Sequence, residues 1–278
     1  MASSTDLVFD ASVAVRISQN DIPATVTSAL QQAAYRELEH GRGYLVIQTP
    51  PAPPLAEAKA LLIAVSRMLG KVMPQDFEGE QVREVRDRGA DITSSRSARY
   101  SDTRFGGHLH TDGMHRPGHI PDYFTLLCQR AALAGGESVF VRVEDIVKRL
   151  RPSPGVLAVL SQEFHFDSRD TSGVGPRTVL RPVLEDTSTG TRINYLRQYI
   201  DSAHSAQDVP DLSSEQTAAL DAVDEVLADT SLHRFARLAD GQLMIINNRR
   251  LVHGRTEFTD SDDPEKRRLL LRTWIDAR

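Results

Sequence analysis

The segment His108-Leu109-His110-Thr111-Asp112-Gly113 decides how the rest of this 278-residue chain is interpreted. His110 and Asp112 are two residues apart, so on an extended backbone their side chains point to the same side of the chain. Far downstream, the segment Asn248-Arg249-Arg250-Leu251-Val252-His253-Gly254-Arg255 supplies another histidine. If the two segments meet in the fold, His110, Asp112 and His253 form a cluster of two imidazoles and one carboxylate.

This residue set is chemically specific, although alternatives exist. Two neutral imidazoles and one carboxylate are the ligands that hold Fe(II) in non-haem oxygenases, and they leave three adjacent coordination positions for a cosubstrate and O2. A zinc hydrolase can use the same ligands, and a lone His253 can be a hydrogen-bonded structural residue. His108 and His110 can also begin a cupin-like site. That motif needs a glutamate where Met114, His115 and Arg116 stand.

Composition excludes several classes of protein. The net charge of −5 gives no electrostatic basis for binding nucleic acid or an anionic membrane. No apolar run approaches the ~20 residues of a membrane helix, and Met1–Asp10 does not resemble a secretory signal. Cys128 is the only cysteine, so it forms no internal disulfide, and we expect it to be buried in a strand. These features predict a cytoplasmic protein without nucleic-acid or membrane partners.

Hydrophobic periodicity predicts helices early in the chain and short strands later. The predicted helices are Ile22–His40, Leu55–Leu69, Val143–Arg151, Gly155–Leu160 and Ser213–Ala228, with Ser213 as N-cap. The predicted strands are Tyr44–Ile47, Tyr123–Gln129, Ser138–Val141, Thr178–Val183, Arg192–Tyr195, His233–Arg237, Gln242–Asn247 and Leu269–Ile275. Asp240-Gly241 is expected to join two of them as a hairpin. The pattern favours an α+β fold with a jelly-roll-like core flanked by helices, formed by residues 1–278 as a single domain.

Four segments in order resemble the taurine dioxygenase and clavaminate synthase-like family of Fe(II)/2-oxoglutarate oxygenases. They are His110-Thr111-Asp112-Gly113, Pro121–Cys128 leading into Gly135-Gly136-Glu137-Ser138, Asn248-x-Arg250-x-x-His253-Gly254-Arg255, and Arg267-Arg268-Leu269-Leu270-Leu271-Arg272. The resemblance extends from about Gly107 to Trp274. It implies a double-stranded β-helix, Fe(II), 2-oxoglutarate and O2, with succinate and CO2 as co-products.

By position, the resemblance also implies roles for individual residues. His110, Asp112 and His253 would be the catalytic metal ligands. Arg268 would bind the far carboxylate of 2-oxoglutarate, because a guanidinium can grip a carboxylate with two parallel hydrogen bonds. Ser138 stands where the family has threonine and could donate to the same carboxylate. Arg272 would meet an acidic group of the substrate, and Arg267 is the rival of Arg268 if the register is shifted by one residue.

The substrate is less specified by the sequence. Arg197 and Tyr195 lie on a segment, 192–199, that we expect to be a strand and that could face an anionic or amino-acid substrate. The irregular segment Arg83–Arg104 could act as a lid. We expect hydroxylation of a small carboxylate-bearing substrate, such as an amino acid, free or held on a carrier protein. A sulfonate or aryloxy acid is the alternative substrate. A metal-dependent hydrolase and a non-catalytic jelly-roll binding protein are the alternatives of other classes, and homo-oligomerisation is left open.

Overall fold

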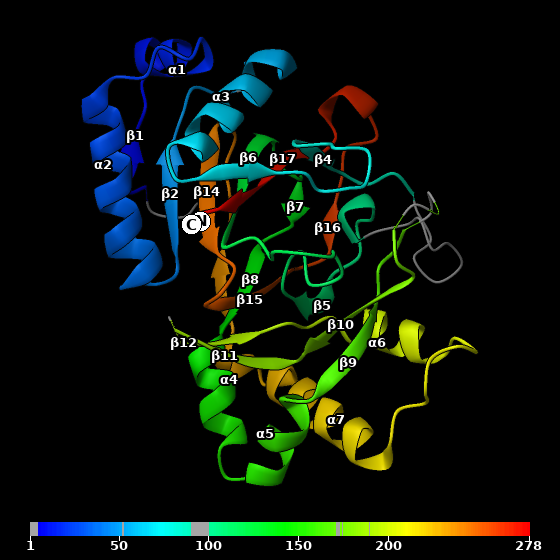
Figure 1. The fold of residues 1–278 in the computed structure, drawn as a ribbon. Helices are drawn as coiled ribbons and strands as arrows, with labels where there is room; N and C mark the ends of the chain where they lie inside the picture. The colour runs from blue at the N-terminus through cyan, green and yellow to red at the C-terminus, as the bar shows by residue number, and fades with distance from the viewer. Residues whose placement is uncertain (1–4, 52, 90–99, 171–172, 174, 189) are drawn as a thin grey trace.

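The computed structural model describes residues 1–278 except 1–4, 52, 90–99, 171–172, 174 and 189 (Figure 1). Its larger sheet has seven strands. In spatial order the strands are β1 (Leu7–Val8), β2 (Tyr44–Gln48), β14 (Gln242–Asn247), β6 (Tyr123–Arg130), β17 (Leu269–Asp276) and β3 (Lys71–Met73). The seventh strand, β4 (Arg83–Val85), pairs with another part of β17. All of its pairs are antiparallel except β1 with β2.

A second, four-stranded antiparallel sheet carries the histidines of interest. Its strands, in spatial order, are β13 (Arg234–Ala236), β8 (Ser138–Arg142), β15 (Leu251–Arg255) and β5 (Gly107–His110). Three two-stranded ladders complete the set: β9 (Glu163–Asp167) with β10 (Thr178–Pro182), β11 (Leu184–Thr187) with β12 (Gly190–Ile193), and β7 (Ala134–Gly135) with β16 (Phe258–Thr259).

Helices cover the outer sides of both sheets (Figure 1). The helices are α1 (Ala11–Ser18), α2 (Ala24–Ala34), α3 (Leu55–Arg67), α4 (Val143–Leu150), α5 (Pro154–Leu160), α6 (Arg197–His204) and α7 (Ser214–Ala228). Ser213 caps α7 in a capping box with Gln216, as the sequence predicts. Within the described ranges, none of these helices is long and apolar enough to cross a membrane.

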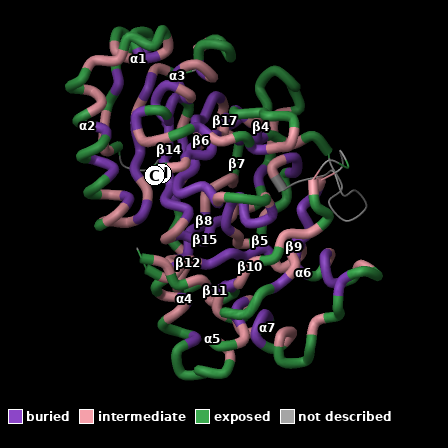
Figure 2. Tube along the Cα trace, viewed as in Figure 1, coloured by how far each residue is buried: buried purple, intermediate pink, exposed green. Residues whose placement is uncertain are grey.

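Buried residues are concentrated in the strands between the outer helices (Figure 2), and strand alternation explains how the layers are filled. Along β14, Leu243 and Ile245 pack with α1, α2 and α3, whereas Met244 and Ile246 pack with residues of the other sheet. Successive side chains of a strand point to opposite faces, so one fully buried strand serves two cores. The inner core between the sheets also contains Phe140 from β8. On the far side of the smaller sheet, a third core joins it to α4, α5 and α7.

The predicted elements are largely present. Each strand predicted after residue 122 forms, with ends displaced by two residues at most, and α2, α3, α4, α5 and α7 match the predicted helices. Two expectations are wrong. Asp240-Gly241 does not close a hairpin, because β13 pairs with β8 in one sheet and β14 pairs with β2 and β6 in the other. The turn therefore carries the chain between sheets.

The second error concerns the segment 192–199, which was expected to be one strand. Strand β12 ends at Ile193, and α6 begins at Arg197. Tyr199, Ile200 and Ala203 are buried, with the spacing of a helical face. Arg197 also forms an ion pair with Asp201 one turn later, at 2.9 Å, which favours a helix.

Cys128 allows a direct test of the inner core. Its side chain is buried, and burial raises the pKa of the thiol to about 12, so almost no reactive thiolate forms at pH 8. We expect an aromatic disulfide reagent to label native Cys128 at least about a hundredfold more slowly than the guanidinium-unfolded chain. An exposed Ser28→Cys variant should take up one additional equivalent rapidly while native. Equal labelling rates for folded and unfolded protein would contradict the burial of Cys128.

Candidate metal centre

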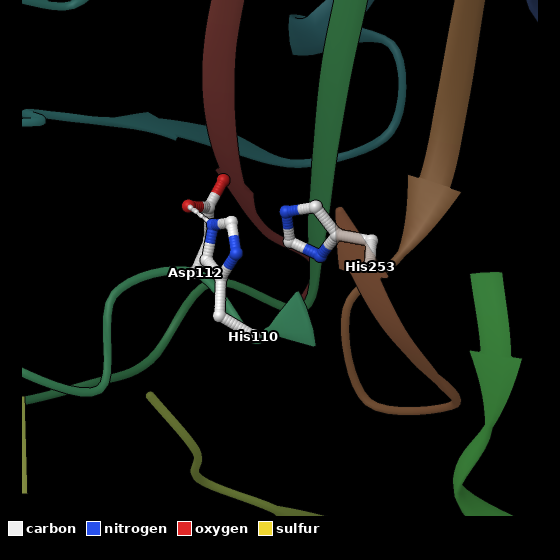
Figure 3. A group of neighbouring side chains, drawn as sticks. All are labelled: His110, Asp112 and His253. Atoms are coloured by element: carbon white, nitrogen blue, oxygen red, sulfur yellow. Dashed lines mark ion pairs between the residues drawn. The ribbon is translucent and has the colours of Figure 1, made fainter. Parts of the chain in front are cut away.

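The two predicted segments meet in the smaller sheet. Strands β5 and β15 are antiparallel neighbours, and His110 is the register partner of His253. The two imidazole ring centroids are 4.4 Å apart. The Nε2 atom of His110 lies 3.8 Å from Oδ1 of Asp112. One donor atom from each of the three residues lies within 4.8 Å of the others, and the side chains converge as Figure 3 shows.

Hydrogen bonding orients the His110 ring for this cluster. Nδ1 of His110 lies 2.9 Å from the carbonyl oxygen of His108. Because a carbonyl can only accept, the proton resides on Nδ1 and the lone pair on Nε2, the atom nearest Asp112. In His253, Nδ1 is buried and has no hydrogen-bond partner among the residues that the structure describes. The other ring nitrogen of His253, Nε2, is the one that faces His110 and Asp112 (Figure 3).

The protonation states also suit a divalent metal. Burial lowers the pKa of His110 and lowers that of His253 well below its usual value, so both rings are neutral. Burial alone would raise the pKa of Asp112, but the positive charge of Arg272 and a hydrogen bond from Trp274 contribute to lowering it to about 2. Two lone-pair donors and one carboxylate are therefore available at neutral pH without proton release. The donor set fits Fe(II).

Strand β17 surrounds the Asp112 carboxylate with donors. Nη1 of Arg272 lies 3.1 and 3.2 Å from its two oxygens, and Nε1 of Trp274 donates to Oδ2 at 2.9 Å. Nε of Arg272 donates to the side chain of Gln75, which is fully buried. Arg272 thus contacts one of the predicted metal ligands, and its predicted contact with the substrate stays a prediction.

Asp112 is held by a loop rather than by the strand. Strand β5 ends at His110, so alternation along a strand does not by itself place Asp112. The amide of Asp112 donates to Oδ1 of Asn248 at 2.8 Å, and Nδ2 of Asn248 donates to the carbonyls of Asp112 and Pro121 at 3.0 and 2.9 Å. Gly113 adopts a positive φ of 80°, and a Cβ there would lie 2.4 Å from the Pro121 ring. A glycine is therefore required after Asp112.

Asn248→Ala should destabilise the protein and loosen the metal centre. Three backbone groups would lose their buried partner, and we expect the free energy of unfolding to fall by about 2–4 kcal/mol. Urea denaturation measures this change. Gln32→Ala, which removes an exposed side-chain hydrogen bond on α2, is the matched control and should cost less than about 0.5 kcal/mol. If both variants unfold at the same urea concentration, Asn248 does not anchor the loop.

A cavity of about 120 Å³ opens beside the cluster. Arg268, Arg272 and Ser138 line it together with His110, Asp112 and His253. The remaining wall is mostly apolar, including Val85, Phe105, Phe124, Leu126, Phe140 and Leu270. Apolar walls exclude water and strengthen electrostatic interactions inside a site.

Arg268 has the features of an unsatisfied anion ligand. Its side chain is buried over the ring of Phe258, and Nη1 has no hydrogen-bond partner within the described part of the chain. Burial lowers its pKa to about 10, so the group stays charged at neutral pH. The neighbouring Arg267 is exposed and donates to the carbonyls of Ser261 and Asp262. The geometry favours Arg268 over its rival.

The structure corrects the prediction for Tyr195 and Arg197. Neither lines the cavity. The Tyr195 hydroxyl donates to Asp224 of α7, and Arg197 forms ion pairs with Asp201, Asp221 and Asp224. With α6 in place of a strand, both side chains are directed away from the metal centre. The backbone of Tyr195 holds the segment between His110 and Asp112. Its carbonyl accepts from the amide of Thr111, and its amide donates to the Thr111 hydroxyl.

The predicted lid falls partly outside the described residues, because 90–99 are not described. Its first residues form β4, and Arg83 forms an ion pair with Asp102 at 2.8 Å. Sequence reasoning missed Gln75, Asn248 and Trp274. Trp274 could have been found from its spacing, since it lies two residues after Arg272 on the same strand. Gln75 gives no such signal.

Comparison with known proteins agrees with this geometry. A family model described as "Taurine catabolism dioxygenase TauD, TfdA family" matches residues 9–274. The curated "FR-33289 synthase" of Streptomyces rubellomurinus (strain ATCC 31215) is 26% identical over 268 residues, covering 94% of this chain and 77% of that protein. Crystal structures of an asparagine oxygenase with Fe(II), 3-hydroxyasparagine and succinate, and of the non-heme iron oxygenase OrfP with Fe and alpha-ketoglutaric acid, share the fold.

The asparagine oxygenase structure has a TM-score of 0.69 at 20% identity, covering 99% of this chain and 94% of its own. The OrfP structure has a TM-score of 0.69 at 18% identity, covering 98% and 94% respectively. At these identities the structural likeness describes the fold. The family match extends over nearly the whole sequence and includes both histidine segments. The chain belongs to the taurine catabolism dioxygenase TauD, TfdA family.

Proposed function

We propose that this protein is an Fe(II)/2-oxoglutarate-dependent oxygenase that hydroxylates an unactivated C–H bond of a small carboxylate-bearing substrate. Succinate and CO2 would be the co-products. The observation that carries the proposal is the single cavity shared by His110, Asp112 and His253, by Arg272, and by the buried Arg268, whose Nη1 has no hydrogen-bond partner among the described residues.

The proposal assigns a role to each predicted site residue that lines the cavity. Iron with bound 2-oxoglutarate supplies the activation of O2, which the side chains cannot perform. His110, Asp112 and His253 hold the metal. Arg268 binds the far carboxylate of the cosubstrate with its free Nη1, and the Ser138 hydroxyl donates to the same group.

Arg272 links metal binding to substrate binding in this proposal. Its guanidinium contacts both oxygens of Asp112, and a metal would take at least one of them. Part of the guanidinium would then be released to meet a substrate carboxylate. Because Arg272 is buried, its charge would attract an acidic substrate group through a low-dielectric medium, where electrostatic interactions are stronger than in water.

A free or carrier-bound amino acid is the proposed substrate class. Asparagine oxygenase and OrfP are solved with hydroxylated asparagine and arginine respectively, and both share this fold. A sulfonate or aryloxy acid is the alternative, since Arg272 would accept either anion. We further propose that the two main sheets form a double-stranded β-helix, that residues 1–278 act as one domain, and that the protein functions in the cytoplasm.

Anaerobic titration tests the proposal directly. Fe(II) and 2-oxoglutarate added to the protein without O2 should give the weak visible charge-transfer band of the chelate. A metal hydrolase with the same ligands would bind iron without that band. A non-catalytic binding protein would not consume 2-oxoglutarate when O2 is admitted with candidate amino acids. Absence of both the band and 2-oxoglutarate binding would refute the proposal.

A further inference from the structure

A second and larger cavity lies away from the metal centre. Its volume is about 410 Å³, within the usual range for small-ligand sites. It is formed where α4, the β11–β12 ladder and the β14–β15 connection come close to the chain after α2 (Figure 1). Six arginines line it, and we call it the arginine cleft: Arg42, Arg142, Arg151, Arg192, Arg249 and Arg250.

The cleft has a marked excess of positive charge. Only two acidic residues, Glu39 and Glu144, are among its described lining residues. Glu39 forms an ion pair with Arg249 at 2.8 Å, and Glu144 is exposed. The whole chain, by contrast, carries a net charge of −5. The concentration of arginines is therefore a local feature of this cleft.

Most of these arginines form no ion pair with a described residue, although Glu185 stands opposite Arg192 in the β11–β12 ladder and its charge favours the charged guanidinium. Arg42 pairs with Asp6, and Arg249 with Glu39 and Asp122. No carboxylate among the described residues lies within ion-pair distance of the other four, which are Arg142, Arg151, Arg192 and Arg250. Arg250 instead donates to two backbone carbonyls, those of Leu38 and Glu39.

Arg142 and Arg192 are also poorly satisfied by hydrogen bonds. Nε of Arg142 and Nη2 of Arg192 are buried without a partner in the described portion of the structure. Burial lowers the pKa of Arg192, because its charge lies partly out of water. Buried arginine nitrogens are normally hydrogen-bonded, so a bound anion would relieve an unfavourable arrangement.

The geometry points to a specific kind of anion. Arginine presents a planar fork of donors that matches the oxygens of a phosphate. The arginines come from several chain segments and surround a concave space that also has apolar lining from Val143, Val147 and Leu251. A group with several charged oxygens attached to an organic body would use both features. We propose that the arginine cleft is a second binding site, separate from the metal centre, for a small organic phosphate held through its phosphate group.

The cleft adjoins elements that carry the metal centre. Leu251 and His253 lie on the same strand, β15. Arg249 and Arg250 directly follow Asn248, which holds the Asp112 loop. A ligand in the cleft would contact this connection without entering the catalytic cavity, and the proposal does not depend on the reaction assigned to that cavity.

Calorimetric titration with pyrophosphate at a fixed ionic strength of 0.15 M tests the site. We expect saturable binding that an Arg142→Gln/Arg192→Gln double variant weakens at least tenfold. The matched control is Arg149→Gln/Arg177→Gln, which removes the same charge from two exposed arginines that have their own ion pairs, and it should bind like the unaltered protein. Arg151→Gln, at the exposed rim of the cleft, should also weaken pyrophosphate binding. This single variant replaces the double variant as the test if the double variant does not fold.

Two further titrations show which cavity binds the anion and which part of the ligand is recognised. Arg268→Ala removes an arginine from the catalytic cavity and should leave pyrophosphate affinity unchanged. An organic phosphate monoester should bind more tightly than inorganic phosphate, because only the monoester can use the apolar wall. Loss of binding in Arg268→Ala would place the anion in the catalytic cavity and overturn the proposal. Equal weakening in both double variants, or equal affinity for sulfate, would mean diffuse charge attraction and would also overturn it.

Discussion

Asp112→Ala is expected to reduce succinate formation to the background of the metal-free protein. The substitution removes the only carboxylate of the cluster, and two neutral imidazoles hold a divalent ion far more weakly than the complete set. It also leaves Arg272 buried without its ion-pair partner, which costs about 3–5 kcal/mol of stability. Succinate yield, iron content and the thermal midpoint should all be measured, because loss of folding would imitate loss of the ligand.

Asp112→Asn separates the two effects. The amide keeps an oxygen that can accept from Trp274 and Arg272, so we expect it to fold while still losing iron and succinate formation. Asp208→Asn, an exposed carboxylate that pairs with Arg177, is the control and should be fully active. A normal succinate yield from folded Asp112→Ala would show that Asp112 is not a ligand.

Arg268→Ala should raise the KM for 2-oxoglutarate by about 10- to 150-fold, the equivalent of losing a charged hydrogen-bonding partner worth about 1.5–3 kcal/mol. The far carboxylate of the cosubstrate would be left in a buried place without a counter-charge. Arg268→Lys should recover part of the loss, since it restores charge but not the bidentate fork. Initial rates at varied 2-oxoglutarate concentrations separate KM from kcat.

Arg267→Ala is the natural control for this experiment, because Arg267 is adjacent in sequence but exposed and hydrogen-bonded to a loop. It should leave the KM for 2-oxoglutarate unchanged. If Arg267→Ala raised that KM and Arg268→Ala did not, the assignment of the two arginines would be reversed.

Regular alternation made much of the fold predictable from the sequence. Strand β14 was predicted with its observed ends, because each of its residues is buried between two cores and turn residues flank it. Helix α6 was not predicted, because the alternating cationic and aromatic residues of segment 192–199 suggested a strand. The helical spacing of its buried residues, Tyr199, Ile200 and Ala203, extends beyond that segment. Asp240-Gly241 has the chemistry of a hairpin turn. Which strands it joins depends on long-range pairing that no local pattern contains.

The metal ligands could be predicted from the sequence because their residue types point to a particular chemistry. The residues that hold those ligands in place could not, because their roles depend on contacts between distant segments. His110, Asp112 and His253 could be singled out because the Gly135-Gly136 turn and the Arg268 segment stand with them in the order of a known family, which made a weak ligand pattern specific. Gln75 and Asn248 act through buried amides, and an amide in a sequence carries no sign of what it will bind. Tyr195 and Arg197 were placed wrongly for the same reason, because their acidic partners lie on a helix that follows later in the chain.

The single buried thiol of Cys128 makes this protein convenient for site-specific spectroscopy. Any cysteine introduced on the surface can carry a nitroxide or fluorophore without first removing a native one. A label at Thr191, which lines the arginine cleft, paired with one on a distant helix would report distances as pyrophosphate or 2-oxoglutarate is added. Communication between the two cavities can then be followed in the otherwise unaltered protein.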